Sequence, residues 1–100
     1  MVQREDFFER VWELVAEIPY GRVATYGQLA DMLGYPRHAR LAGAAMHHAP
    51  QGLPCHRVVN SQGRTAPGWT GQRELLAAEG VHFRANGCVD LSASGWEEIG

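Results

Sequence analysis

The chain has 100 residues, of which 45% are hydrophobic and 20% are charged, and its formal net charge is -2 at pH 7. This length supports one domain with a single modest core, and this composition excludes the disordered and fibrous classes. No apolar run reaches the roughly 20 residues of a membrane span, and the acidic start lacks the features of a signal peptide. We therefore expect one domain over residues 1–100, in the cytoplasm, with no membrane partner.

The small net charge conceals an uneven distribution of charge along the chain. Residues 20–73 carry six arginines and one acidic residue, whereas residues 1–19 and 74–100 are acidic. All nine basic residues are arginine, whose planar guanidinium makes forked contacts with phosphates and base edges. The basic middle therefore indicates a nucleic-acid surface, although a composition bias of the source genome would also explain the absence of lysine.

The first predicted helix runs from about residue 5 to residue 18, where apolar residues recur with helical spacing and charged residues fall largely on the other side. Pro19 and Gly21 break this helix, and the β-branched residues that follow predict a short extended stretch. Thr25 is expected to cap a second helix, which is short and ends in a glycine.

A third helix is predicted over residues 37–48 and is joined to the second by the segment GYP. Two short helices with a glycine-containing turn have the length of a helix-turn-helix, a geometry that also occurs in ordinary helical cores. Arg40, Ala44 and His47 share one face of this helix, and the residues around Gly43 leave its middle nearly bare. Such a helix can approach either DNA or the first helix closely, and both alternatives can hold on different faces.

Residues 56–66 predict a β-hairpin with its turn at residues 60–63, which would be a wing after the helix-turn-helix. Thr70 is expected to cap a last helix over residues 71–80. The tail alternates around a second turn at residues 85–87 and predicts a small two-stranded ribbon. The predicted fold class is therefore α+β: a winged helix-turn-helix that is mostly helical, with a small wing hairpin and a short C-terminal β-ribbon.

The segment GLPCHRVVNSQG places a thiol beside an imidazole. A free cysteine has a pKa of about 8.5, so a reactive cysteine needs a base within reach. Adjacent residues of an extended strand point to opposite faces, so His56 can assist Cys55 only if the chain bends or a water bridges the two side chains. Pro54 supplies a reason for a bend. Glu79 is the one carboxylate of an apolar stretch at a helix end, and it is the candidate that would orient the imidazole.

Other interpretations of these residues are open. Cysteine is among the most buried residue types and usually only packs, and a strand histidine is more often hydrogen-bonded scaffolding. Zinc could bind Cys55, His56, His47 and His48, but the chain contains neither a CxxC nor an HExxH motif, so no metal is expected. Two cysteines are too few for a disulfide framework, and Cys88 is expected to be structural.

Four segments carry a resemblance to a known family: IPYGRVATYGQLA, ARLAGAAMHH, PCHRVVNSQGR and LLAAEGV. In this order and at these separations they resemble the C-terminal, active domain of the O6-alkylguanine-DNA alkyltransferases, the methylated-DNA–protein-cysteine methyltransferases. The resemblance covers about residues 8–82. The tail GVHFRANGCVDLSASGW resembles instead that of the alkyltransferase-like proteins, which bind alkylated DNA without repairing it and normally lack the cysteine.

The resemblance implies a DNA repair protein that flips O6-alkylguanine out of duplex DNA and transfers the alkyl group irreversibly to Cys55, without a cofactor. His56 and Glu79 would deprotonate Cys55 through a water, Tyr26 would turn the target phosphate, and Arg40 would fill the stack that the base leaves. The residues implied in binding DNA through the minor groove are Tyr26, Gly27, Ala39, Arg40, Leu41, Gly43 and Arg64. The residues implied in the base pocket are Met46, Pro54, Val58, Trp69 and Thr70.

Two positions depart from the family pattern. Ala49 stands where the family usually has an asparagine after the third helix, and the loop at Trp69 and Thr70 is shorter than in the family. The alternative function is therefore that of an alkyltransferase-like protein, which recognises O6-alkylguanine without transfer. Both functions imply a monomer whose partner is double-stranded DNA containing O6-alkylguanine, and other repair proteins would be further partners.

Overall fold

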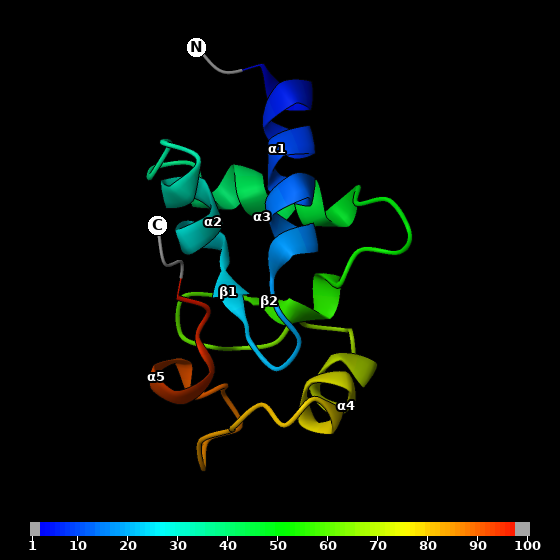
Figure 1. The fold of residues 1–100 in the computed structure, drawn as a ribbon, viewed down its shortest axis with the longest axis vertical. Coiled ribbons are helices and arrows are strands. Elements are labelled where there is room, and N and C mark those ends of the chain that lie inside the picture. Colours follow the sequence, from blue (N-terminus) through cyan, green and yellow to red (C-terminus); the bar gives the residue numbers. More distant parts are fainter. Residues whose placement is uncertain (1–2, 98–100) are drawn as a thin grey trace.

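The computed structural model describes residues 3–97 and shows a mostly helical protein with one small sheet (Figure 1). In chain order the elements are α1 (Arg4–Glu17), β1 (Ala24–Thr25), α2 (Tyr26–Met32), α3 (Ala39–His47), the 3-10 turn η1 (Cys55–Arg57), β2 (Val58–Val59), α4 (Gly71–Ala78) and α5 (Leu91–Ser94). This arrangement confirms the predicted α+β, mostly helical fold with a helix-turn-helix, and it differs from the prediction in the wing and the C-terminal ribbon. None of the described helices is long and apolar enough to cross a membrane.

Helices α1, α2 and α3 lie together on one side of the sheet, in the upper half of Figure 1. The helical spacing of Phe7, Val11 and Val15 buries all three on one face of α1. Trp12 Nε1 of α1 donates a hydrogen bond to the carbonyl oxygen of Ala45 in α3, at 2.8 Å. Ala45 is fully buried, so this small residue of α3 allows the helices to pack closely. Close packing on the first helix was one of the two alternatives that the sequence left open.

The strands β1 and β2 pair in parallel and lie between two hydrophobic cores. Side chains alternate across a strand, so neighbouring residues face opposite sides. Ala24 and Val58 pack into the core of α1, α2 and α3, whereas Val23 and Val59 pack into a second core with Leu76 of α4. The strand pair therefore connects the helix-turn-helix to the C-terminal half of the chain.

Helices α2 and α3 form the predicted helix-turn-helix. The side-chain oxygen of Thr25 accepts a hydrogen bond from the amide of Gln28 at 3.0 Å, which confirms the predicted cap of α2. After α2 the chain turns at Gly34, whose φ of 87° lies in the left-handed region that glycine adopts without strain. Helix α3 is shorter than the predicted helix at both ends, and it ends at His47, before Pro50.

The predicted wing is a turn without a returning strand. Asn60 Oδ1 accepts hydrogen bonds from the amides of Gln62 at 2.9 Å and Arg64 at 2.8 Å, so the turn lies where the sequence placed it. No strand follows Arg64 within residues 65–97, and β2 pairs with β1 instead. The extended run and turn of residues 56–66 predicted a local partner, because such a pattern carries no information on a parallel partner elsewhere in the chain.

The C-terminal ribbon is smaller than predicted. Its turn is present, with the Gly87 amide donating to the Arg84 carbonyl at 2.9 Å, but the two sides pair only through one antiparallel bridge between Phe83 and Val89. The chain then forms α5, which the sequence did not predict. After α5 it runs beside β1, where Gly95 forms a parallel bridge with Val23.

The two polar residues that precede α4 and α5 differ in their capping. Asp90 Oδ1 accepts a hydrogen bond from the amide of Ser92 at 3.1 Å and so caps α5. Thr70 makes no capping hydrogen bond to α4, so that prediction was wrong. Its backbone is already helical, with φ of -66° and ψ of -27°, whereas a capping residue has an extended backbone that directs its side chain to the helix amides.

Candidate functional site

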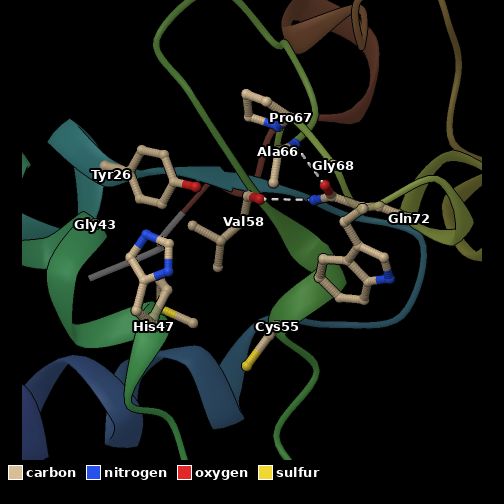
Figure 2. Close-up of a pocket in the computed structure, with 11 residues that line it drawn as sticks. Tyr26, Gly43, His47, Cys55, Val58, Ala66, Pro67, Gly68 and Gln72 are labelled. Atoms are coloured by element: carbon tan, nitrogen blue, oxygen red, sulfur yellow. Dashed lines mark hydrogen bonds between the residues drawn. The ribbon is translucent and has the colours of Figure 1, made fainter.

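A cavity of about 390 Å³ opens between α2, α3, η1 and the loop before α4 (Figure 2). Six of the predicted site residues line it: Tyr26, Gly43, Met46, Cys55, Val58 and Trp69. Five lining residues were not predicted as parts of the pocket: His47, Ala66, Pro67, Gly68 and Gln72. The predicted pocket residues Pro54 and Thr70 lie outside the lining, the first just before η1 and the second exposed before α4.

The turn η1 directs the side chain of Cys55 away from the side chains of His56 and Arg57. The Arg57 amide donates to the Pro54 carbonyl at 3.0 Å, so the chain does bend after Pro54. Successive side chains of a 3-10 helix are about 120° apart. Cys55 therefore faces the cavity, while His56 and Arg57 both contact Glu79 at the end of α4.

The thiol of Cys55 is free and partly buried. Burial raises the pKa of Cys55, and a hydrogen bond with the backbone opposes that rise. The protonated thiol is therefore the main form at neutral pH, and a base is needed to generate the thiolate, which is the reactive form.

The carboxylate of Glu79 is nearly enclosed, with 8% of its side chain exposed, and it binds three groups. Its Oε2 lies 2.6 Å from His56 Nε2, its Oε1 accepts from the Gly21 amide at 2.8 Å, and both oxygens accept from Arg57. Burial by itself would raise the pKa of Glu79, but the hydrogen bonds from Arg57, Gly21 and His56 outweigh burial and lower the pKa to about 2. Glu79 is thus ionised at neutral pH, and the predicted contact between His56 and Glu79 is present.

The contact with Glu79 sets the role of each nitrogen of His56. A carboxylate only accepts hydrogen bonds, so the neutral ring donates from Nε2 and its Nδ1 becomes the acceptor. No hydrogen bond joins His56 to Cys55 between residues 3 and 97. The arrangement can accept a proton from the thiol at Nδ1, directly or through a water, while Glu79 stabilises the resulting imidazolium.

Gln72 fixes the wall of the cavity, a role that the sequence analysis missed. It is fully buried, and its Nε2 donates to the carbonyl oxygens of His56 at 3.1 Å and Val58 at 2.9 Å. Its Oε1 accepts from the Ala66 amide at 2.7 Å, so one side chain joins η1, β2 and the loop that borders the cavity (Figure 2). A glutamine four residues before the buried Leu76, on the same face of α4, was the available signal.

A groove of about 420 Å³ runs along the outer face of α3 beside the cavity. Its lining confirms that Arg40, Ala44 and His47 share one face, and Tyr26 and Gly43 border both hollows. Ala39, also predicted to bind DNA, lines the groove. The other predicted DNA-binding residues lie elsewhere: Leu41 packs against the first core, Gly27 lies in α2 outside the groove lining, and Arg64 is exposed in the turn after β2.

Half of the arginines of the basic middle bind other groups of the protein through their side chains. Arg22 and Arg73 donate to backbone carbonyl oxygens at 2.9 and 3.0 Å, and Arg57 binds Glu79. Of these three, only Arg57 has its charge balanced by a carboxylate, whereas Arg22 and Arg73 stay exposed. The arginines of this segment whose side chains form no hydrogen bond or ion pair with the residues described are Arg37, Arg40 and Arg64.

The residues weighed as zinc ligands do not converge. His56 binds Glu79, and the ring of His48 stacks on Phe8 with their centroids 5.8 Å apart. Within residues 3–97 no three histidine, cysteine, aspartate or glutamate side chains are grouped to hold a metal ion. Cys55 and Cys88 are both free, and Cys88 is buried as expected of a structural residue.

Comparison with known proteins found matches to a family model and to several relatives. The family model described as "6-O-methylguanine DNA methyltransferase, DNA binding domain" matches residues 6–81. The chain is 45% identical over 101 residues to the DNA base-flipping protein of Escherichia coli K12, with 95% of the chain and 78% of that protein covered.

Two further relatives differ in the share of their length that the chain covers. A crystal structure of Schizosaccharomyces pombe Atl1 in complex with damaged DNA containing O6-carboxymethylguanine matches with a TM-score of 0.81 and 34% identity, covering 98% of the chain and 100% of that protein. The methylated-DNA–protein-cysteine methyltransferase of Mycobacterium tuberculosis is 44% identical over 61 residues, which cover 59% of the chain and 37% of the enzyme.

Proposed function

The chain belongs to the family of the 6-O-methylguanine DNA methyltransferase DNA-binding domain, and on this premise we propose that it recognises O6-alkylguanine in duplex DNA by taking the base out of the helix. The observation that carries this proposal is the cavity beside α3, which is lined by Cys55, Met46 and Trp69. Its volume of about 390 Å³ falls among those of small-molecule pockets. The relatives named as a base-flipping protein and crystallised with damaged DNA support the same function.

In the proposed complex, α3 lies in the minor groove. Gly43 and Ala44 leave the outer face of α3 low enough for the DNA backbone and base edges to approach. Arg40 lies on that same face and fills the space that the base leaves, while Tyr26, at the border of groove and cavity, turns the phosphate. Unstacking a base costs about a few kcal/mol and costs least for a damaged pair, which contributes to selectivity.

The test of recognition is a comparison of two duplexes that differ only in one base, O6-methylguanine or guanine. Fluorescence anisotropy should give a lower Kd for the damaged duplex. A fluorescent base analogue opposite the lesion should brighten on binding if the damaged base leaves the stack. Equal affinity for the two duplexes would contradict the proposal.

Alkyl transfer to Cys55 is a second candidate function, supported by the position of the thiol on the cavity wall and by the His56–Glu79 contact. The Cys55 thiol would lose its proton, and the sulfur would attack the alkyl carbon as the bond from that carbon to O6 breaks. The proton would end on guanine, so the products are a thioether on the protein and an unmodified base. One turnover would consume the protein.

Transfer requires that the Cys55 thiol first lose its proton, and burial, which raises the pKa of the thiol, opposes that loss. Intact-mass measurement after incubation with the methylated duplex separates the two functions. One added methyl group that is lost in Cys55→Ala would demonstrate transfer, whereas an unchanged mass with lesion-selective binding would identify a recognition protein.

A further inference from the structure

His47 is the last residue of α3, and its side chain borders both the cavity and the groove. Figure 2 shows its imidazole turned toward the hollow, between Tyr26 and Cys55 in that view. The ring makes no hydrogen bond or ion pair with any residue between 3 and 97. The next residue, His48, is used differently, because its ring stacks on Phe8 at an interplanar angle of 20°.

The hollow around His47 contains no carboxylate among the described residues that line it. The titratable and charged side chains that face it are Tyr26 from α2, Cys55 from η1 and Arg40 from α3, and α4 contributes the neutral Gln72. Burial raises the pKa of Tyr26 and of Cys55, so neither side chain is negatively charged at neutral pH.

The carboxylates of neighbouring elements are directed elsewhere. Glu9 and Glu13 of α1 border a separate hollow between α1 and the loop after α3, and Asp31 of α2 lines neither the cavity nor the groove. The negative charge of Glu79 is balanced by Arg57, and its carboxylate binds Arg57 and His56 instead of facing the hollow. A positive charge on His47 would therefore meet no carboxylate of the protein's own inside the hollow.

His47 stands in the last turn of α3, and it is exposed where it borders the cavity. Histidine gains its charge in the range of about pH 5 to 8. A protonated imidazole at the edge of a cavity whose lining residues include no carboxylate suits a ligand group that carries a negative charge.

We propose that His47 determines specificity by favouring O6-alkyl groups that end in a carboxylate, such as carboxymethyl, over neutral groups of the same size. This inference rests on the proposed recognition of O6-alkylguanine. In that complex the alkyl group points to Cys55, which has the position of the family's alkyl acceptor, and a longer group extends along the wall that His47 shares. The imidazolium then donates a hydrogen bond to the carboxylate of the lesion.

The test compares duplexes that contain O6-carboxymethylguanine or its neutral amide, O6-carbamoylmethylguanine, in one sequence. The two groups have nearly the same shape, so the ratio of the two Kd values reports charge and cancels the common contribution of the phosphates. For the unaltered chain, anisotropy at low salt should give a preference of about threefold to fivefold for the carboxylate near pH 6, which decreases toward equal affinity near pH 8.

Three variants identify the group responsible. His47→Gln should bind both lesions but lose the pH dependence of the ratio, whereas His47→Lys should keep the preference for the carboxylate at both pH values. His48→Gln is the matched control and should behave as the unaltered chain does.

A ratio of one at both pH values, or a pH dependence that persists in His47→Gln, would overturn the inference. So would equal weakening of all duplexes by His47→Gln, undamaged duplex included, because His47 would then contact the DNA backbone. If neither lesion bound more tightly than guanine, the proposed function itself would be refuted.

Discussion

Arg57 binds both carboxylate oxygens of Glu79, with Nε 3.0 Å from Oε1 and Nη2 2.9 Å from Oε2. The same guanidinium donates from Nη1 to the carbonyl oxygen of Ile18 at 2.9 Å, just after α1. Glu79 therefore supports the imidazole of His56 and also joins α4 and η1 to the segment that leaves α1. A change at Glu79 should affect both the stability of the fold and the chemistry at Cys55.

The pH dependence of stability should reflect this carboxylate. The pKa of Glu79 falls from 4.5 to about 2 in the folded protein, so its stabilising contribution is complete above about pH 5 and is lost as the pH decreases through 2. Glu79→Gln should lower the free energy of unfolding at neutral pH by about 2 kcal/mol, because Arg57 loses its charged partner. Urea unfolding at several pH values checks both points: the difference between the two proteins should shrink as the pH decreases from 5 to 2.

Replacement of Gln72 should weaken the wall of the cavity. Gln72→Leu leaves the carbonyl oxygens of His56 and Val58 without their donor and the Ala66 amide without its acceptor. We expect a loss of stability of about 2 to 3 kcal/mol, together with reduced discrimination between O6-methylguanine and guanine duplexes. Thermal unfolding and anisotropy measure the two effects, with the exposed Glu74→Gln of the same helix as the control. An unaltered discrimination in folded Gln72→Leu would contradict the positioning role.

Arg40 and Arg64 should contribute to DNA binding in different ways. Arg40 lines the groove of α3, so Arg40→Ala should weaken binding of the damaged duplex about tenfold at every salt concentration. Arg64 is exposed in the turn after β2, so Arg64→Ala should mainly reduce the slope of log K against log salt, by about one. Titrations at four salt concentrations separate the two effects. If neither variant altered the isotherms, the DNA would bind to another face.

Gly43 allows stability and DNA binding to be separated. A Cβ at this position would lie 4.0 Å from a ring carbon of Tyr26, which is ordinary contact distance, so Gly43→Ala should fold and gain about 0.5 to 1 kcal/mol of stability. Gly43→Leu would extend into the groove and should abolish binding of duplex DNA while the helical circular dichroism is retained. Normal binding by Gly43→Leu would exclude α3 as the helix that contacts DNA.

The sequence predicted those features that depend on neighbours along the chain. Helical periodicity located α1, α2, α3 and α4, and Thr25 caps α2 as predicted. The wing was wrong because Val58 and Val59 pair with residues far upstream, and a local pattern carries no signal for parallel pairing.

The residues of the candidate site were likewise predicted only in part. Cys55, His56 and Glu79 were predicted together from chemistry and resemblance, and the structure brings His56 and Glu79 into contact and places Cys55 on the cavity wall. Gln72 and His47 were missed as parts of the cavity, because a residue's part in a cavity depends on which elements pack around it. That packing follows from the whole fold and not from the residues beside each position in the sequence.

The strand pair that lies between the two cores has a consequence for folding. Val58 belongs to one core and Val59 to the other. If one half of the protein lost its packing, the strand that carries both residues would be disturbed, and the other half would lose part of its support. The helix-turn-helix and the C-terminal half should therefore melt together in one cooperative transition. The cavity lies across this junction, and it exists only while both halves are folded.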